Sequence, residues 1–194
     1  MTEKFQKELT ISIVLEELPL QLFLICSISG FFLSFYYIPS ENEAYLSIQR
    51  IHEEVYLGKL MRGIHKWSAN VLIITLIIHS IRVFVTKSYR PPRELNWIVG
   101  VILFIIVMVE GFTGYLLPWD QKAYWATVVG TNIVGSIPFI GETLLLIVRG
   151  GYEVTGVTLN RFYSLHILWF PLIIMLLLWA HFHMIKKLGI SKPL

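Results

Sequence analysis

The chain has 194 residues, of which 55% are hydrophobic and only 15% are charged. A soluble domain usually carries about 25% charged residues, so the composition disfavours a soluble protein, and 14% aromatic residues exclude a disordered chain. The net charge of +3 comes from basic residues spread along the chain, which argues against nucleic-acid binding. The one cysteine, Cys26, excludes an intrachain disulfide and is expected to be a small buried apolar residue. We therefore expect one membrane-embedded domain, residues 1–194.

Four long stretches with almost no charge predict transmembrane helices. A helix rises about 1.5 Å per residue, so about 20 apolar residues are needed to cross the hydrocarbon core. The predicted spans are residues 19–38, 62–86, 96–118 and 162–186. The expected fold class is all-α, a transmembrane four-helix bundle.

A fifth uncharged stretch, residues 123–141, is not expected to cross the membrane. It contains three glycines, an asparagine and a proline, which interrupt helices and whose backbone groups would need partners inside lipid. We expect this stretch and residues 142–148 to form short surface helices between the third and fourth spans. The mixed charges of the first ten residues do not resemble a cleavable signal peptide.

Positive charges predict the orientation of the chain in the membrane. With four spans, both termini lie on the same side as the connection between the second and third spans. That side holds nine of the 16 basic residues: Lys4, Lys7, Arg82, Lys87, Arg90, Arg93, Lys186, Lys187 and Lys192. Because the cytoplasmic side of a membrane protein is enriched in Lys and Arg, we place both termini in the cytoplasm.

Four histidines inside the predicted spans carry most of the functional information. His65 and His79 are 14 residues apart on the second span, and His166 and His181 are 15 apart on the fourth. At 100° per residue, each pair faces roughly one side of its helix, about 21 Å apart along the axis. The two helices run parallel, so His65 lies level with His166 and His79 with His181. Two stacked imidazole pairs are what two hexacoordinate haems require, and such haems transfer electrons rather than bind substrate.

Other readings of these histidines stay open at this point. A single intramembrane histidine is explained equally well by a structural hydrogen bond or a proton relay. Zinc requires clustered tetrahedral ligands rather than two separated pairs. The matched spacing of four residues favours haem. His183 is turned about 200° from His181 and His52 lies outside the spans, so neither is expected to be a ligand.

Glycines and cations near the histidines fit the haem interpretation. Gly100 and Gly114 on the third span are also 14 residues apart, and Gly30 lies on the first span. A macrocycle between helices needs small residues where the backbone passes its face, although ordinary helix packing also explains one glycine. Haem propionates need counter-charges. Three cations within one turn of the second-span histidines are candidates, with surface snorkelling as the alternative: Arg62, Lys66 and Arg82.

Five segments resemble the cytochrome b family, most closely its short, split form in cytochrome b6 and Gram-positive quinol reductases. They are RGIHKWSAN (62–70), RPPRELNWIVG (90–100), GFTGYLLPWDQ (111–121), RFYSLH (161–166) and AHFHMIKKLGISKPL (180–194). The similarity covers roughly residues 30–194. It implies a subunit with two non-covalent b haems, an outer one on His65 and His166 and an inner one on His79 and His181.

The resemblance also implies a function and partners. The chain would carry electrons across a bacterial cytoplasmic membrane between quinone sites of a quinol–cytochrome c, or similar, reductase. Its partners would be a Rieske iron–sulfur protein, a subunit IV-like C-terminal cytochrome b half, a cytochrome c, quinone, lipid and a second copy of the chain. The family's PEWY-type loop belongs to that C-terminal half, so the chain alone is not expected to oxidise quinol efficiently. The alternative is a di-haem anchor linking a different dehydrogenase or reductase module to the quinone pool.

The chain departs from the family near the first span. Some split-type members bind an extra haem through a cysteine, but the matching position here is Val14 or Leu22, so no covalent haem c is expected. Glu16 stands where the family has a glycine, so the first helix is expected to begin differently, around Glu17 and Pro19.

Two further residues have open roles. Glu110 is a carboxylate within the third span, where an unpaired charge costs on the order of 2.5–3.5 kcal/mol. It is interpreted either as a proton relay or quinol contact, or as a protonated side chain hydrogen-bonded within the bundle. Lys186 is interpreted as a contact to a propionate or an inner quinone, or as a positive-inside anchor.

Overall fold

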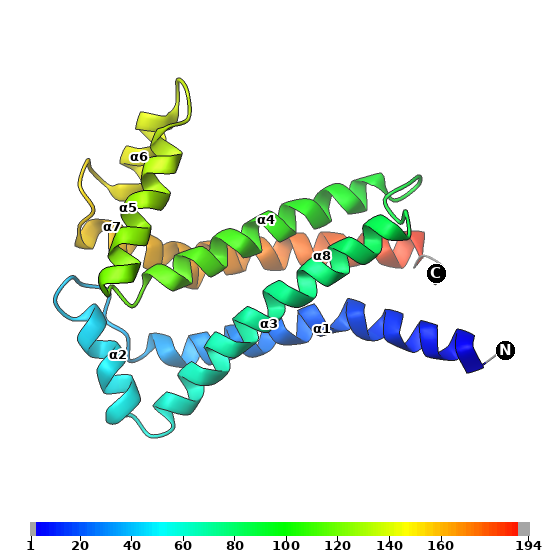
Figure 1. Ribbon diagram of the computed structural model, residues 1–194, viewed down its shortest axis with the longest axis horizontal. Coiled ribbons are helices and arrows are strands. Elements are labelled where there is room, and N and C mark those ends of the chain that lie inside the picture. The colour runs from blue at the N-terminus through cyan, green and yellow to red at the C-terminus, as the bar shows by residue number, and fades with distance from the viewer. Residues whose placement is uncertain (1–2, 190–194) are drawn as a thin grey trace. The chain divides into compact units, whose positions relative to one another are not determined.

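The computed structural model describes residues 3–189, with side chains from residue 17 onward. Lys192 lies outside the described residues, as do the side chains of Lys4, Lys7 and Glu16. The described part is all helical (Figure 1). Its elements in chain order are α1 (Glu3–Ser34), α2 (Ala44–Glu53), α3 (Gly58–Val85), α4 (Glu94–Leu116), α5 (Gln121–Gly135), α6 (Gly141–Arg149), α7 (Gly156–Ser164), the π-helical segment η1 (Leu165–Trp169) and α8 (Phe170–Leu188).

Four helices are long and apolar enough to cross a membrane, as the sequence predicts. The spans are Glu17–Ser34, Gly58–Val85, Glu94–Leu116 and Gly156–Leu188. Only 6–17% of each span's most apolar window is buried, and large apolar side chains such as Trp67 and Trp179 are 67% and 70% exposed. Such exposure is unfavourable in water and is what helices surrounded by lipid require.

The helix ends differ slightly from the predicted spans, for local reasons. The apolar span of α1 begins near the predicted residue 19, but the helix itself begins at Glu3 and continues through Pro19. The polar first part of α1 is rich in Glu, Lys and Leu, which are good helix formers. A search for uncharged runs cannot detect such a polar start of a helix. α1 ends at Ser34, short of the predicted residue 38. Residues 35–36 form a turn, and Ile38 precedes Pro39, a position that disfavours helical backbone.

The stretch after the third span forms short helices, as predicted. α5 begins with Asp120, whose side chain accepts a hydrogen bond from the Ala123 amide at 2.8 Å. α6 ends at Gly150, whose φ of 84° is a left-handed conformation that favours glycine. α2, between the first and second spans, was not predicted. Its polar sequence AYLSIQRIHE has no long apolar run.

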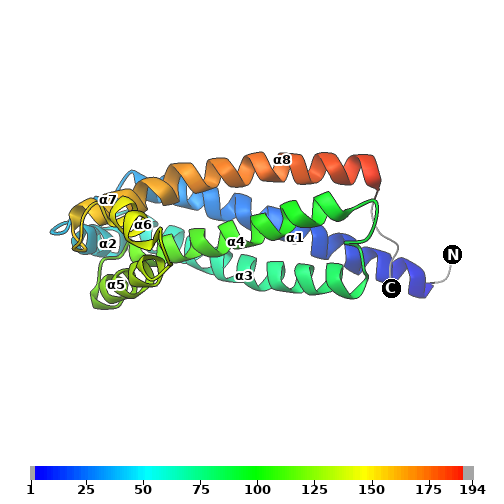
Figure 2. The same ribbon diagram turned by 90° about the horizontal axis from the view of Figure 1, so that it is seen from above.

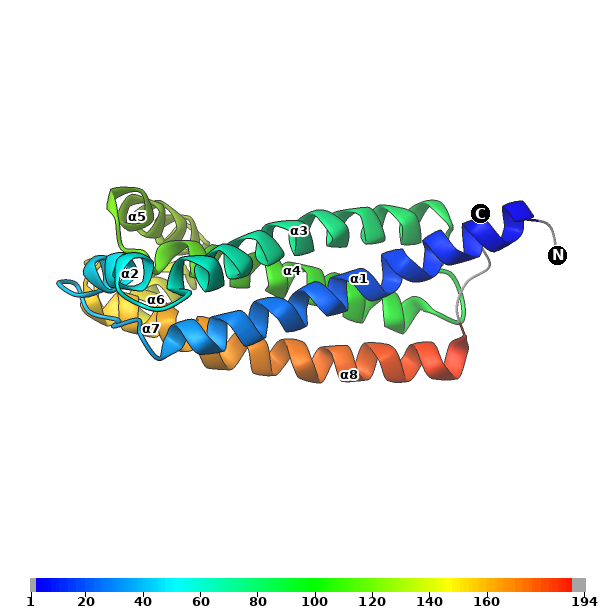
Figure 3. The same ribbon diagram turned by 90° about the horizontal axis from the view of Figure 1, so that it is seen from below.

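The chain divides into two compact units, and each long span contributes to both. Unit 1 comprises residues 1–29, 63–108 and 172–194. Its core holds Leu72, Leu103, Val107 and Ile174, from α3, α4 and α8, and Phe23 of α1 packs against them. The four helical segments of unit 1 run side by side (Figures 2 and 3). The start of α1, the 86–93 connection and the end of α8 lie at the same end of the unit (Figure 1).

Unit 2 comprises residues 30–62 and 109–171. Its core holds Tyr37, Ala44, Ile51 and Leu159, so α2 and α7 pack around the end of α1. The Tyr37 hydroxyl donates a 2.6 Å hydrogen bond to the Leu117 carbonyl. Burial raises the pKa of Tyr37 well above its ordinary range, so the hydroxyl remains a donor at neutral pH.

Arg149 of α6 joins three parts of unit 2. It is 7% exposed, and its guanidinium donates to Thr131 Oγ1 at 2.7 Å, the Tyr152 carbonyl at 2.8 Å, the Val128 carbonyl at 3.0 Å and Asn132 Oδ1 at 2.8 Å. A planar guanidinium presents several donors at fixed angles. The residue therefore ties α6 to α5 and to the segment that follows α6.

We expect Arg149→Met to lower the melting temperature of the protein in detergent. The substitution leaves buried acceptors without their donor, at a cost on the order of 3 kcal/mol. The matched control is Arg50→Met, since Arg50 pairs with Glu43 at 2.7 Å and both side chains are about 40% exposed. Such a surface pair is worth about 0–1 kcal/mol. Equal melting temperatures for the two variants would contradict the role of Arg149.

Candidate functional site

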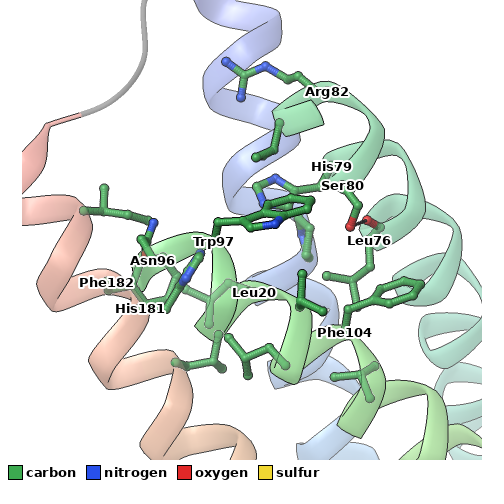
Figure 4. Close-up of a pocket in the computed structure, with 18 of the residues that line it drawn as sticks. Leu20, Leu76, His79, Ser80, Arg82, Asn96, Trp97, Phe104, His181 and Phe182 are labelled. Carbon is green, nitrogen blue, oxygen red and sulfur yellow. Dashed lines mark hydrogen bonds between the residues drawn. The ribbon is translucent and has the colours of Figure 1, made fainter. Parts of the chain in front are cut away.

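A cavity of about 470 Å³ lies within unit 1, among α1, α3, α4 and α8. His79 reaches it from α3 and His181 from α8 (Figure 4). The remaining lining is mostly apolar, and includes Leu76, Trp97 and Phe104. A largely apolar cavity of this size with a few polar groups is typical of a cofactor site. The structure thus places in one cavity the two histidines, His79 and His181, that the sequence predicts to lie level with each other.

Gly100 leaves room for one of these histidines. A Cβ atom built on Gly100 would lie 3.4 Å from Cε1 of His181, so the α4 backbone passes directly beside the imidazole ring. Gly100 also lines the cavity. Gly100 was predicted to face a macrocycle, and the structure places it beside the His181 ring and in the cavity lining.

Polar groups gather along part of the cavity lining. Arg82, a predicted propionate partner, contributes to the lining, as do Arg93 and Asn96. Arg93 donates a 3.3 Å hydrogen bond to the Gly189 carbonyl. The Oδ1 atom of Asn96 is buried and has no hydrogen-bond partner among the described residues. Arg93 and Asn96 were missed in the sequence, although both lie in the RPPRELNWIVG segment.

His65 lies on α3 against α1, also within unit 1. Its Nδ1 is 2.9 Å from the Cys26 carbonyl and 3.4 Å from the buried hydroxyl of Ser29. The Cys26 thiol lies 3.5 Å from the same nitrogen. Because a carbonyl can only accept, Nδ1 carries the proton and Nε2 is the nitrogen suited to bind iron. Cys26 was expected to be a buried apolar residue, but it is half-buried and contacts this histidine.

His166 lies in unit 2, on the π-helical segment η1. Its Nδ1 is 3.2 Å from both the Glu110 carbonyl and Thr113 Oγ1, and 3.1 Å from the Glu110 carboxylate. A Cβ atom on Gly114 would lie only 2.5 Å from Cε1 of this ring. The α4 backbone therefore approaches His166 more closely than any side chain at residue 114 would allow.

The remaining predicted site residues lie elsewhere. Arg62 belongs to unit 2, where its Nη1 is 2.6 Å from Nε2 of His52. Lys66 and Lys186 have exposed side chains, and Gly30 lies on α1 in unit 2. His183, which was not expected to be a ligand, stacks on Trp179 with ring centroids 5.6 Å apart.

The contact between Arg62 and His52 is expected to affect the pKa of His52 and the pH dependence of stability. Burial, and then the Arg62 and Lys59 cations, lower the pKa of His52 below its ordinary value of 6.5. The folded protein thus binds fewer protons than the unfolded chain just below pH 6.5, so stability falls as the pH drops through that window. We expect Arg62→Gln to raise the pKa of His52, as read by NMR titration in detergent. Arg50→Gln, on α2 with His52, should leave the pKa of His52 unchanged, and an equal rise in both variants would contradict the assignment.

Among the side chains that the structure describes, from residue 17 to 189, no cluster of three or more His, Cys, Asp or Glu could bind a bare metal ion. His79 and His181 line one cavity, whereas His65 and His166 each have their own partners at Nδ1. Two of the histidines have hydrogen-bonded Nδ1 atoms, two glycines lie against imidazole rings, and two histidines line a cavity. These features fit a metal that is already bound in a macrocycle, for which the protein supplies only the remaining ligands.

Comparisons with known proteins agree with this chemistry. The family described as Cytochrome b/b6/petB matches residues 3–189. Cytochrome b6 of Crocosphaera subtropica is 46% identical over 172 residues, which cover 89% of this chain and 78% of the relative. Cytochrome b6 of Heliobacterium mobile is 43% identical over 177 residues, covering 91% and 83%.

A solved structure shares the fold over nearly the whole chain. A chain of a structure named Hyperthermophilic respiratory Complex III superposes with a TM-score of 0.87 at 37% identity. The match covers 93% of this chain, which spans about half (49%) of the length of that one. With four apolar helices and these relatives, the chain is an integral membrane protein that belongs to the cytochrome b/b6 family of haem b-binding subunits of quinol oxidoreductases.

Proposed function

We propose that the chain is the di-haem subunit that carries electrons across the membrane in a cytochrome bc-type quinol oxidoreductase complex. The observation that carries the proposal is the cavity of unit 1, because His79 and His181 both line it and Gly100 lies beside the His181 ring. These features support a haem site with two histidine ligands. Family membership supports haem b as the group that fills it. Quinone and quinol are the proposed substrates of the complex.

The inner site would be built by residues of unit 1. His79 and His181 would hold the haem iron, and Gly100 would keep the α4 backbone clear of the group. Arg82 would pair with a propionate, since it lines the same cavity. Trp97 and other apolar lining residues exclude water, which limits the reorganisation that accompanies a change of charge.

The outer site would pair His65 with His166. The sequence spacing supports this pairing, and hydrogen bonds at Nδ1 orient both rings so that Nε2 would bind iron. Gly114 and Gly30 would admit the macrocycle. Arg62, Lys66 and Lys186 stay candidate cations for propionates or quinone.

The chemistry of both sites follows from full coordination. Each haem, when bound, supplies a one-electron Fe(III)/Fe(II) couple. Two histidines holding each iron would suit electron transfer rather than binding of oxygen or substrate at the metal. The chain would thus conduct electrons, and quinol oxidation would take place where it meets its partners.

The proposed partners and location follow from the family. They are a Rieske iron–sulfur protein, a subunit IV-like C-terminal cytochrome b half, a cytochrome c or similar acceptor, membrane lipid and a second copy of the chain. We place the complex in a bacterial cytoplasmic membrane with both termini cytoplasmic. The 86–93 connection and the end of α8, which lie at one end of unit 1 (Figure 1), are rich in Lys and Arg in the sequence, which supports this orientation. No covalent haem c is proposed.

The proposal is tested on the chain purified from membranes in mild detergent. Acid–acetone extraction followed by a pyridine haemochrome spectrum should give two extractable b haems per chain. Subunits that co-purify should show the electron paramagnetic resonance signal of a Rieske cluster. Absence of haem would overturn the proposal, whereas two haems with a dehydrogenase or reductase module in place of the Rieske protein would make the chain an anchor for that module.

A further inference from the structure

Glu110 is the one acidic residue within the four long apolar spans beyond their first turns. It lies on α4, one turn before Gly114, and its side chain is 17% exposed. Its Oε1 atom lies 3.1 Å from Nδ1 of His166, and its Oε2 atom is buried without a hydrogen-bond partner among the described residues. The contact with His166 is therefore what holds this carboxylate in place.

Three acceptors surround the single Nδ1 proton of His166. They are Oε1 of Glu110 at 3.1 Å, the Glu110 carbonyl at 3.2 Å and Thr113 Oγ1 at 3.2 Å. Thr113 donates its own proton to the same Glu110 carbonyl at 2.8 Å, so that carbonyl already has a donor. An ionised carboxylate at this position would be the strongest acceptor of the three, because hydrogen bonds to charged groups are roughly twice as strong as neutral ones.

His65 provides an internal comparison. Its Nδ1 donates to the Cys26 carbonyl at 2.9 Å, with the Ser29 hydroxyl nearby. Both of these groups are neutral. His65 and His166 thus differ in the kind of group that accepts the hydrogen bond from Nδ1: neutral groups at His65 and a carboxylate at His166.

We propose that the Glu110 carboxylate is the positioning residue of His166, and that it lowers the reduction potential of the haem that His166 binds. The inference rests on the proposed function, because it needs His166 to be an iron ligand. An acceptor at Nδ1 fixes the ring orientation and raises the basicity of Nε2. A more basic ligand stabilises ferric over ferrous iron, so hydrogen bonding to a ligand is one way a protein sets a haem potential.

The test is an optical redox titration of the full chain in detergent, comparing wild type with Glu110→Gln. Glutamine keeps the size of the side chain and an oxygen acceptor but removes the charge. We expect one of two haem couples to shift upward, with the Fe(II)/Fe(III) ratio at fixed potential rising about tenfold, or about 59 mV for one electron. The other couple should not move. Glu94→Gln, at the opposite end of α4, is the matched control and should change neither couple.

A second variant covers the case in which Glu110→Gln fails to retain haem. Glu110→Asp keeps the charge but withdraws the carboxylate by one C–C bond, about 1.5 Å. It should raise the same couple by a smaller amount.

The outcomes separate this inference from the function on which it rests. A wild-type chain without haem would overturn the proposed function itself. If the wild-type chain holds two haems but Glu110→Gln shifts neither potential, or shifts both equally, the inference alone would be overturned. The inference would also fail if quinol-linked turnover changed without any shift in potential, because that result would indicate a proton relay.

Discussion

His79→Ala and His166→Ala should each contain one b haem per chain instead of two, and each should lose a different one. Each of these histidines is proposed to supply one of the two protein ligands of its haem, so its loss would leave that haem with a single ligand. His79 lines the unit 1 cavity, whereas His166 is held by Glu110 and Thr113 in unit 2. Pyridine haemochrome assays give the stoichiometry, and redox difference spectra show which haem is absent.

His183→Ala is the matched control for these two variants. His183 lies two residues from His181, but it is exposed and stacks on Trp179. We expect this variant to keep both haems. If both His79→Ala and His166→Ala also kept two haems, the histidines would return to structural or proton-relay roles.

Gly114→Ala should eliminate the haem bound by His166, because the new methyl group would lie 2.5 Å from the imidazole ring. Alanine is intrinsically better than glycine in a helix by about 1 kcal/mol, so backbone propensity alone predicts a stabilising change. Overpacking a well-filled site costs about 1–3 kcal/mol. Here the ring must move from its Glu110 and Thr113 contacts, so the steric effect is expected to prevail.

Alanine substitutions at two other glycines, Gly63 and Gly100, serve as comparisons for Gly114→Ala. Gly63→Ala on α3 meets nothing within 4 Å and should leave both haems and the melting temperature intact or slightly raised. Gly100→Ala places its methyl group 3.4 Å from His181, so we expect a small change in the inner haem only. Retention of both haems with unchanged spectra in Gly114→Ala would show that the close approach has no role in binding.

The four spans could be predicted from the sequence because lipid imposes a simple rule, namely about 20 apolar residues for each crossing. The fold is confirmed by the four long helices and by the family match. The pairing of His79 with His181 at one depth followed from helical geometry, and both residues line the same cavity. Gly100 and Gly114 could be chosen because their spacing matches that of the histidines, and each lies against one of the rings.

Other features depend on tertiary contacts that no local pattern contains. The partner of Glu110 lies 56 residues away in the sequence, so the sequence left its role open. Arg62 was chosen for its distance from His65, but its local contact is His52 on α2, a helix that apolar runs do not reveal. Asn96 was missed because a single amide carries no pattern of its own.

The π-helical segment η1 explains a small irregularity in the sequence. The histidines of the second span are 14 residues apart, but those of the fourth are 15 apart. A π-helical turn takes one more residue than an α-helical turn, and η1 includes His166. The extra residue therefore keeps the helical rotation close to that of 14 steps. Its position at a proposed ligand agrees with the frequent occurrence of π-bulges at functional sites.

The most direct test of the central claim is electron transfer across a sealed membrane. The purified chain is reconstituted into vesicles that contain ferricyanide, with valinomycin and potassium to balance charge, and dithionite is added outside. We expect wild-type vesicles to consume the trapped ferricyanide, whereas His79→Ala and His166→Ala vesicles should do so no faster than protein-free ones. Wild-type vesicles that behave like protein-free vesicles, or a one-haem variant as fast as wild type, would contradict a two-haem path through this chain.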